Sequence, residues 1–337
     1  MRWRDELTRR FPKLARLGPE SYVVGGAIRD LLLGREPLDV DVACIDPLDA
    51  AKRIRERVIT LGSEEHLRAY RVVDNEHVYD FTELLEHDLE IDLTRRDFTV
   101  NAMAVELATG TLLDPHDGQR DLEARIVRMV RASNFDDDPL RMLKGVRMAV
   151  KYDFELDPAT LAAIRERAPL IRKVASERIT DELAAIFSAN RFRKAIALLR
   201  DTGLAPHLGL RTIDAHADDV TLAGAYALLS ENELRGEVAT LRRLIDHQDR
   251  IALYDAGEAI ARQLPPILRA LGRDATIDMP DFSIRALLTG EKIAALTGLP
   301  PGKELGQIKR ALLEAQIRGE IASIEEAERF VVSQLDL

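Results

Sequence analysis

Three acidic residues within the first 80 positions have the types and spacing of a metal-dependent active site. Asp39 and Asp41 stand one residue apart, and the apolar run that follows predicts a strand over Val40–Cys44. Because side chains alternate along a strand, the two carboxylates project from one face. Paired carboxylates repel each other unless a cation lies between them, and hard oxygen ligands favour Mg²⁺. Asp80, at the end of another predicted strand, is the candidate third carboxylate.

A glycine pair upstream of these acids predicts a phosphate site. Gly25 and Gly26 follow a predicted strand and precede a predicted helix, where glycine lets the backbone approach phosphate oxygens. Arg29 lies about one helical turn further on, within reach of the same anion. Alone, this pattern also fits a tight turn without a ligand. Together with three carboxylates, it predicts a site that activates a hydroxyl and neutralises a departing pyrophosphate.

The elements that must position these residues change character near residue 120. Before it, strands are predicted at 22–24, 40–43, 70–73 and 77–81, with hairpin chemistry at Asp74-Asn75-Glu76. After it, apolar residues recur at three- and four-residue spacing, which predicts helices. The clearest are Ala159–Arg167, Ile179–Phe187, Phe192–Asp201, Ile284–Thr289 and Leu305–Ile317. The sequence therefore predicts an α+β protein with a small α/β domain followed by an elongated all-α part.

Composition excludes several other classes. The 337 residues suggest about two domains, and 46% hydrophobic with 31% charged residues is typical of a folded protein. No stretch approaches the ~20 apolar residues of a membrane span, and the charged start lacks the pattern of a signal peptide. The single cysteine, Cys44, excludes an internal disulfide. A net charge of −10 argues against a wholly basic surface, and we expect a cytoplasmic protein.

Several motifs, in a fixed order, resemble one family. The segment 25–34 followed by Asp39-Val40-Asp41 resembles the signature of class II tRNA nucleotidyltransferases and bacterial poly(A) polymerases. Further matches follow in the family's order: Arg95–Ala104, Asp114–Gly118, Phe135–Arg141, Ser176–Ile179, Leu299–Gly306 and Gly319–Ile321. The resemblance spans nearly the whole chain and implies a nucleotidyltransferase head over residues 1–122, a helical neck over 123–190, and a tRNA-binding body and tail over 191–337.

The same resemblance implies a role for each matching residue. Gly25, Gly26 and Arg29 would bind the triphosphate, Asp39 and Asp41 would bind metal, and Asp80 would complete the catalytic carboxylates. Arg96 would contact the nucleotide, while Asp97 and Asn101 would shape its pocket. Four residues would lie on the helix that faces the incoming base: Asp138, Arg141, Lys144 and Arg147.

The base-reading helix can also be argued from its own residues. Asp138 followed by Pro139 has the form of an N-cap with proline at the first helical position. Basic residues then recur at three- and four-residue spacing at 141, 144, 147 and 151. An Asp accepts from the exocyclic amino group, and an Arg donates to the ring nitrogen, of cytosine and adenine, whereas uracil and guanine present the opposite pattern. The alternative is an ion pair between Asp138 and Arg141 on a solvated face.

A short connection separates the third carboxylate from the Arg95-Arg96-Asp97 motif. Only the segment Phe81–Ile91 lies between Asp80 and Asp92, and it contains no Lys or Arg. Family members that complete the CCA end carry a longer flexible loop there, which helps the pocket change from CTP to ATP. Members without it resemble the enzymes that add only the two cytidines.

The sequence therefore predicts a template-independent tRNA 3′-end nucleotidyltransferase that uses CTP and Mg²⁺ and adds CC, leaving a separate enzyme to add the terminal A from ATP. Full CCA addition is the alternative. A poly(A) polymerase, an Asp-x-Asp glycosyltransferase and a non-catalytic RNA-binding module are further rivals. Basic residues outside the head either face RNA or lie on solvated helix faces: Arg172, Lys173, Arg178, Arg191, Arg193 and Lys194.

Overall fold

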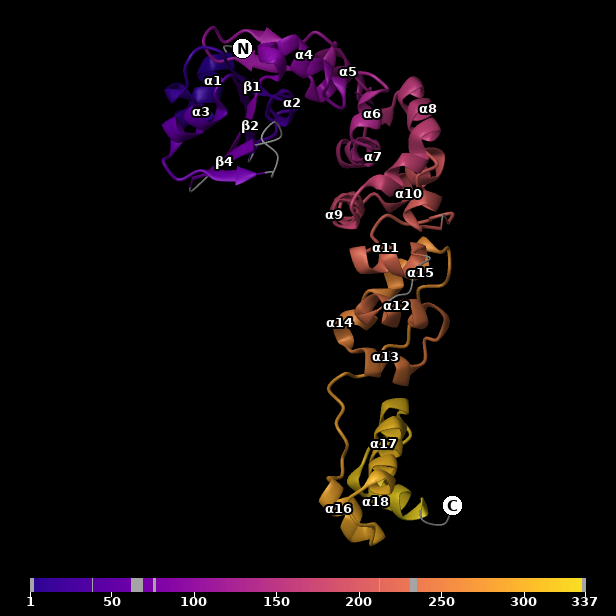
Figure 1. Cartoon of the computed structure of the whole chain (residues 1–337). Helices are drawn as coiled ribbons and strands as arrows, with labels where there is room; N and C mark the ends of the chain where they lie inside the picture. Colours follow the sequence, from indigo (N-terminus) through magenta and orange to yellow (C-terminus); the bar gives the residue numbers. More distant parts are fainter. Residues whose placement is uncertain are drawn as a thin grey trace. The chain divides into compact units, whose positions relative to one another are not determined.

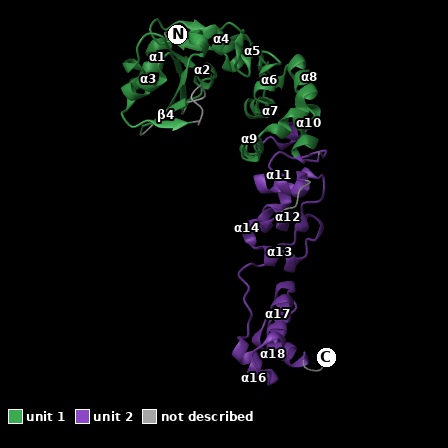
Figure 2. Cartoon of the chain, in the orientation of Figure 1, with its two compact units in different colours: residues 1–189, 197–208 green, residues 190–196, 209–337 purple. Residues whose placement is uncertain are grey.

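The computed structural model describes residues 3–37, 39–61, 69–74, 77–211, 213–230 and 235–334. Contacts divide the chain into two compact units (Figure 2), residues 1–189 with 197–208, and residues 190–196 with 209–337. Figure 1 labels the helices of both units and some of the strands of the first. Among the described residues, none of the helices has the length and apolar character needed to cross a membrane.

A mixed seven-stranded sheet organises the first unit. Its strands are β1 (Ser21–Val24), β2 (Asp39–Cys44), β3 (Ile59–Leu61), β4 (Ala69–Val73), β5 (Val78–Glu83), β6 (Ala104–Glu106) and β7 (Leu112–Leu113). Their order in the sheet is β3-β4-β5-β2-β1-β6-β7; among the described residues of this sheet, β2 and β5 pair in parallel and the other neighbours are antiparallel. The four predicted strands are confirmed as β1, β2, β4 and β5. The antiparallel pairing of β4 with β5 confirms the hairpin, although Asn75 and Glu76 lie outside the described residues.

The sheet has a buried face and a face that carries the acids. Val40 and Val42 of β2 are fully buried, whereas Asp39 is exposed and Asp41 is half-buried. This alternation is what a strand between a core and a site produces. Helix α3 (Pro47–Ile54) packs against β2, β4 and β5. A smaller cluster joins the sheet to α4 (Leu89–Thr94): Val24, Ala43, Leu84, Leu93 and Ala104.

The remaining helical elements of the first unit follow the chain. The helices are α1 (Trp3–Arg10), α2 (Gly26–Leu32), α5 (Gly118–Ala124), α6 (Asn134–Asp137), α7 (Leu140–Tyr152), α8 (Pro158–Arg167) and α9 (Ser176–Phe187), with α10 (Phe192–Asp201) shared between the units. The 3-10 turns are η1 (Pro12–Arg16), η3 (Leu85–His87), η4 (Thr99–Asn101), η5 (Ala168–Lys173) and η6 (Ala205–Leu208). The helices predicted at 159–167, 179–187 and 192–201 are confirmed. This mainly helical part also contains a small parallel pair, β8 (Ile126–Val127) and β9 (Glu155–Leu156).

Helix α7 is buried except along one side, which carries a stripe of basic side chains. From Leu140 to Tyr152, the residues that escape full burial are Arg141, Lys144, Arg147 and Lys151. The predicted basic stripe is therefore confirmed. The predicted N-cap is wrong by one residue, because the helix begins at Leu140 with Pro139 at the cap position. The Asp138 carboxylate still accepts a hydrogen bond from the Leu140 N–H at 3.2 Å.

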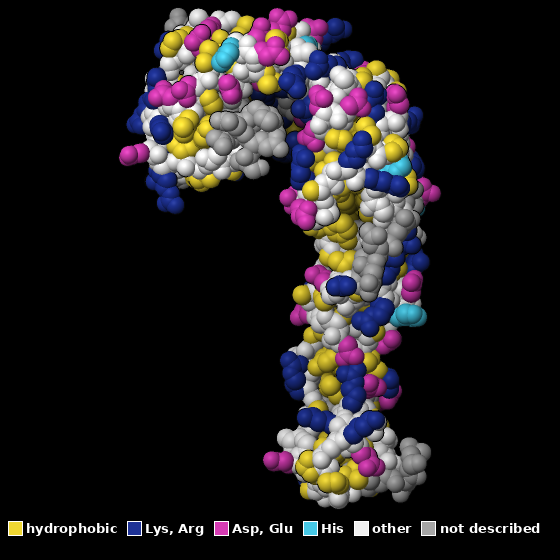
Figure 3. Space-filling view, in the orientation of Figure 1, with side chains coloured by type: hydrophobic (Ala, Val, Ile, Leu, Met, Phe, Trp, Pro, Cys, Tyr) yellow, Lys and Arg dark blue, Asp and Glu magenta, His cyan; other side chains and the backbone are white. Residues whose placement is uncertain are grey.

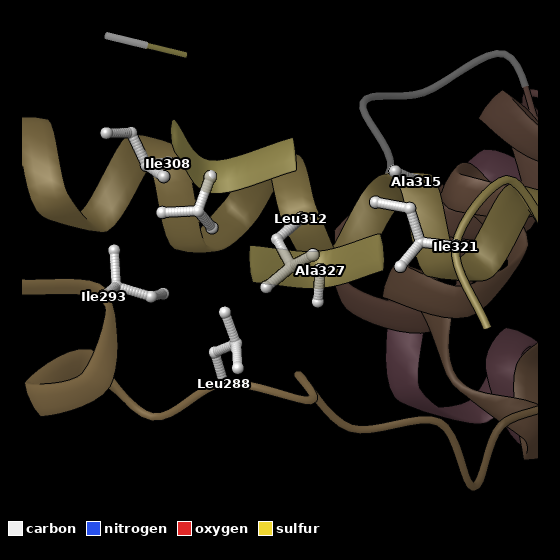
Figure 4. Close-up of a cluster of buried hydrophobic side chains, with 8 residues drawn as sticks. Leu288, Ile293, Ile308, Leu312, Ala315, Ile321 and Ala327 are labelled. Carbon is white, nitrogen blue, oxygen red and sulfur yellow. The ribbon is translucent and has the colours of Figure 1, made fainter. Parts of the chain in front are cut away.

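The second unit is helical, with α11 (Leu222–Leu229), α12 (Gly236–Asp246), α13 (Arg250–Ala256), α14 (Glu258–Ala261), α15 (Leu264–Ala270), α16 (Gly290–Thr297), α17 (Lys303–Arg318) and α18 (Ile324–Ser333). The helix predicted at 305–317 is confirmed as α17. The last three helices enclose their own apolar cluster, which includes Leu288, Ile293 and Leu312 (Figure 4).

The helix predicted over Ile284–Thr289 is wrong. The segment is not helical, and its backbone is held by the buried side chain of Gln316, which accepts from the Leu287 N–H and donates to the Arg285 carbonyl, both at 3.0 Å. Leu288 inserts into the apolar cluster. Tertiary contacts therefore satisfy the backbone groups that a helix would have paired internally.

Candidate active site

The strand register places Asp41 and Asp80 side by side. In the parallel pair of β2 and β5, Asp41 is the partner of Asp80, and in the antiparallel pair of β4 and β5, Asp80 is the partner of Arg71. Directly opposite residues project from the same face of a sheet. Asp39, two residues before Asp41, shares that face. The structure thus brings together the three acids that the sequence singled out.

Burial and neighbouring charge both act on Asp41. Burial raises the pKa of its carboxyl to about 6, the Arg96 guanidinium opposes this shift, and the charges of Asp80 and Asp39 add to it. Carboxylate oxygens are the donors that a hard divalent cation prefers, and a cation between Asp39 and Asp41 would offset the repulsion between the two carboxylates. The pair Asp39 and Asp41 thus fits such a cation. Within the described residues, no group of three or more His, Cys, Asp and Glu side chains could hold a metal ion.

Asp80 is held by a residue that the sequence analysis missed. Arg71 donates from Nε and Nη2 to the two carboxylate oxygens of Asp80, each at 2.7 Å. Such two-point pairing fixes the plane of the carboxylate. The sequence could have indicated that Arg71 contacts Asp80, because a hairpin that turns between Asp74 and His77 places Arg71 opposite Asp80.

Gly25 and Gly26 lie next to the guanidinium groups of Arg96 and Arg29, respectively. Gly25 has φ +74°, a conformation that favours glycine. A Cβ atom at Gly25 would lie 2.9 Å from Nη1 of Arg96 and 3.5 Å from Oδ2 of Asp41. At Gly26, it would lie 3.4 Å from Nη2 of Arg29. The absence of side chains at Gly25 and Gly26 therefore leaves space beside these two guanidinium groups.

A chain of hydrogen bonds orients Arg29. Its Nη1 donates to Oδ1 of Asn101 at 2.5 Å, and Nδ2 of Asn101 donates to Oδ1 of Asp97 at 2.9 Å. The same Asp97 oxygen accepts from the Phe98 N–H at 2.8 Å. Asp97 and Asn101 therefore act on the site through Arg29. Arg96 is held separately by the buried Asp92, at 3.0 Å.

A cavity of about 790 Å³ adjoins these residues, a volume within the range of small-molecule pockets. The cavity is lined by three parts of the chain. The first is residues 82–87, at the end of β5 and just after it. The second is α4 and the turn that follows it, and the third is the end of α6 and the start of α7. From the second and third parts, the lining residues are Asp92, Arg95, Arg96, Asp97, Asp137, Asp138, Arg141 and Lys144. Five predicted nucleotide-binding residues, at positions 96, 97, 138, 141 and 144, are thus brought to one cavity.

The polar groups at the start of α7 already have protein partners. Asp138 accepts from Nη2 of Arg178 at 3.1 Å, and Nη1 of Arg141 donates to the Asn134 carbonyl at 3.1 Å. Arg178 is one of the basic residues considered for RNA contact, but its guanidinium here lies on Asp138. Arg147, further along the stripe, pairs with Glu182 at 2.6 Å.

Charged side chains are interspersed over the face seen in Figure 3, where Lys and Arg are dark blue and Asp and Glu magenta. This mixture agrees with a chain whose net charge is −10. Close to the glycine pair, positive charge comes from Arg29 and Arg96.

Comparison with known families matches two parts of the chain. Residues 21–128 match the family described as the poly A polymerase head domain. Residues 153–210 match the one described as a probable RNA and SrmB-binding site of polymerase A. The first match covers the sheet, the glycine pair and the three acids.

Individual relatives extend the similarity. The CC-adding tRNA nucleotidyltransferase of Synechocystis is 39% identical over 201 residues, which cover 58% of this chain but only about half of that protein (48%). The CCA-adding enzyme of Geobacillus stearothermophilus is 31% identical over 342 residues, covering 92% of this chain and 83% of that one. The CCA-adding enzyme of Streptococcus sanguinis is 35% identical, covering 86% and 78%.

Solved structures agree in fold. The CCA-adding enzyme of Bacillus stearothermophilus in complex with CTP has a TM-score of 0.75 and 26% identity, covering 98% of this chain and 97% of that one. The Thermotoga maritima enzyme complexed with tRNA has a TM-score of 0.72 at 20% identity, covering 94% and 91%. With the shared head domain and relatives matched over most of both chains, the protein belongs to the CCA-adding enzyme family of tRNA nucleotidyltransferases.

Proposed function

We propose that this nucleotidyltransferase adds two cytidines to the 3′ end of tRNA that lacks CCA, without a template, and leaves the terminal A to a separate enzyme. The observation that carries the CC limit is the connection between β5 and α4. β5 ends at Glu83 and α4 begins at Leu89, with one 3-10 turn between them. Leu84 is 3% exposed and packs in the cluster that contains Leu93. A change from a pyrimidine to a purine pocket needs a mobile element, and this connection is short and anchored at its start.

Full CCA addition is the alternative. The CCA-adding enzymes of Geobacillus stearothermophilus and Streptococcus sanguinis are aligned over 83% and 78% of their own length, whereas the CC-adding enzyme of Synechocystis is aligned over 48% of its own. A poly(A) polymerase would share the head domain but would use ATP on many RNA ends.

The proposed reaction uses the groups around the glycine pair. The 3′-terminal hydroxyl of the tRNA attacks the α-phosphorus of CTP and releases its proton to water, a new O–P bond forms, and the bond to pyrophosphate breaks. Arg29 and Arg96 bind the triphosphate above Gly25 and Gly26, and Asp80 is the third catalytic carboxylate.

Asp39 and Asp41 would hold the divalent cation that enzymes of this family generally require, for which we propose Mg²⁺. When bound, the cation would lower the pKa of the attacking hydroxyl and neutralise charge on the pyrophosphate. The protein's own part is to orient Asp41 beside Asp80 and to keep both on one face of the sheet.

Base selection falls to the start of α7. Asp138 and Arg141 line the cavity and present an acceptor and a donor. That pair matches the amino group and ring nitrogen of cytosine and opposes the pattern of uracil. Lys144 lines the same cavity and adds positive charge, and Arg147 continues the stripe.

The helical remainder would hold the tRNA. We propose residues 1–122 as the catalytic head, 123–190 as the neck that carries the base-reading helix, and 191–337 as the body and tail that bind tRNA through shape and phosphate contacts. Because its substrates are CTP and tRNA, we place the activity in the cytoplasm.

Primer extension tests the proposal. Purified protein is incubated with tRNA transcripts ending before CCA, after one C and after CC, with CTP, ATP, UTP or GTP alone and with CTP and ATP together. We expect extension by two C residues and then arrest, even with abundant ATP. Efficient AMP addition to tRNA ending in CC would establish full CCA addition instead, and long A tails on unrelated RNA would indicate a poly(A) polymerase. Asp41→Asn serves as the inactive control.

A further inference from the structure

Tyr152, the last residue of α7, is buried against α2. Tyr152 is only 7% exposed, and its hydroxyl donates to Oδ1 of Asp30 at 2.9 Å. Burial raises the pKa of this hydroxyl to about 12, so it stays protonated and remains a donor at neutral pH. Tyr152 therefore joins the end of the base-reading helix to the helix that follows the glycine pair.

Two guanidinium groups lie over the aromatic ring of Tyr152. Cζ of Arg29 lies 4.7 Å from the ring centroid and Cζ of Arg35 lies 4.8 Å from it. Both distances are within the range of cation–π attraction. The ring thus contacts the same arginine whose guanidinium lies at Gly26.

Arg29 is held from three directions, and Tyr152 takes part in two of them. Nε of Arg29 donates to Oδ1 of Asp30 at 2.9 Å, the oxygen that also accepts from the Tyr152 hydroxyl. The ring of Tyr152 supports the guanidinium directly, and Asn101 accepts from Nη1. Loss of Tyr152 would remove the ring contact of Arg29 and one hydrogen bond of Asp30, and would leave Arg29 with its pairs to Asp30 and Asn101.

The two helices bind opposite ends of one nucleotide. A nucleoside triphosphate has a limited span between its base and its phosphates, so the base-reading residues of α7 and the phosphate-binding residue of α2 must be held at a matching separation. The Tyr152–Asp30 hydrogen bond is a direct side-chain link between these helices.

We propose that Tyr152 is a positioning residue that aims Arg29 at the triphosphate of CTP and fixes α2 to α7. The inference rests on the proposed role of Arg29 in binding the triphosphate. It predicts that Tyr152 contributes to the affinity for CTP through the β- and γ-phosphates and not through the base.

Equilibrium binding of CTP and of CMP to Tyr152→Phe and Tyr152→Leu tests this. Phe keeps the ring and removes the hydroxyl, whereas Leu removes both. We expect CTP affinity to fall about threefold in Tyr152→Phe and about tenfold in Tyr152→Leu. CMP affinity should stay within about twofold of wild type, because CMP lacks the distal phosphates. An equal loss for CTP and CMP, or no loss for CTP, would overturn the inference.

A double-mutant cycle separates this inference from the assignment of Arg29. If Tyr152 acts through Arg29, Tyr152→Leu should cause no further loss of CTP affinity in an Arg29→Ala background. Additive losses would overturn the positioning role. If Arg29→Ala itself leaves CTP affinity unchanged, the proposed role of Arg29 is wrong, which is a different result.

A matched tyrosine controls for loss of a hydroxyl. Tyr254, in the second unit, donates to the Ile284 carbonyl at 2.5 Å, and Tyr254→Phe should bind CTP as wild type does. Thermal unfolding of every variant checks the fold. If Tyr152→Leu does not fold, Tyr152→Phe and its cycle with Arg29→Ala decide the question by the same criteria.

Discussion

Arg71 and Asp80 form a two-point ion pair across neighbouring strands, with both N···O distances 2.7 Å. The register makes them direct partners, and it makes Asp80 the partner of Asp41 on its other side. A positive and two negative side chains therefore lie in one row across β4, β5 and β2. Arg71 fixes the carboxylate of Asp80 and offsets part of the negative charge that Asp41 meets.

Replacing Arg71 should impair turnover more than nucleotide binding. In Arg71→Gln, Asp80 loses its two-point partner, and misplacement of a catalytic group costs up to about 100-fold in rate. We expect kcat for CMP transfer to fall about 10- to 100-fold with little change in KM for CTP. Stability should change by less than about 1 kcal/mol, because the Arg71 side chain is 42% exposed and solvent screens the pair.

Steady-state kinetics and chemical denaturation measure both quantities. Arg55→Gln is the matched control, since Arg55 donates to the Val73 carbonyl on the same strand as Arg71 but contacts none of the three acids. A rise in KM with unchanged kcat would show that Arg71 acts on CTP rather than on Asp80.

Neutralising Asp41 should abolish activity without weakening the fold. Burial raises the pKa of the Asp41 carboxyl to about 6. When no cation is bound, keeping this carboxylate ionised in the folded protein therefore lowers the stability of the fold. We expect Asp41→Asn to lose several orders of magnitude in CMP transfer. Its unfolding temperature in EDTA should be equal to that of wild type or higher, as measured by calorimetry. Near-normal CMP transfer by this variant would remove Asp41 from the catalytic site.

Arg141→Ala should relax base selection more than it weakens tRNA binding. Arg141 lines the cavity and is oriented by the Asn134 carbonyl. Without its donor, discrimination of CTP from UTP should fall about tenfold, the value of one charged hydrogen bond. Competition kinetics with the two nucleotides measures the ratio, and Arg165→Ala on α8 is the control, because Arg165 donates to the Asp201 carbonyl. Unchanged selectivity would show that another group reads the base.

The sequence predicted most of the local structure around the site because alternation and glycine placement are local signals. Val40 and Val42 alternate with Asp39 and Asp41, and that pattern alone indicates which side chains share a face. The helix predicted over 284–289 failed for the opposite reason. Its non-helical backbone is held by Gln316, a residue about thirty positions away, and no local pattern contains that information.

Partners between distant segments were the part that sequence could not supply. Arg178 belongs to a recognised motif, yet its pairing with Asp138 joins residues 40 positions apart. The contact of Tyr152 with Asp30 spans 122 positions. Local spacing identifies which residues carry chemistry, whereas the residues that orient them come from packing between elements.

A glycine inside α7 should prove essential for packing this helix on the head. A Cβ atom at Gly145 would lie 2.8 Å from Cζ of the fully buried Phe98, in the Arg95–Ala104 motif. Gly145→Ala must therefore displace the ring or the helix, and overpacking of this kind costs about 1–3 kcal/mol. Gly306 in α17 is the matched control, because a Cβ atom there meets nothing within 4 Å, so Gly306→Ala should gain up to about 1 kcal/mol from its lower unfolded-state entropy. Urea denaturation of both variants measures the difference. Equal stability in the two would show that Phe98 gives way freely and that α7 does not depend on this contact for its position.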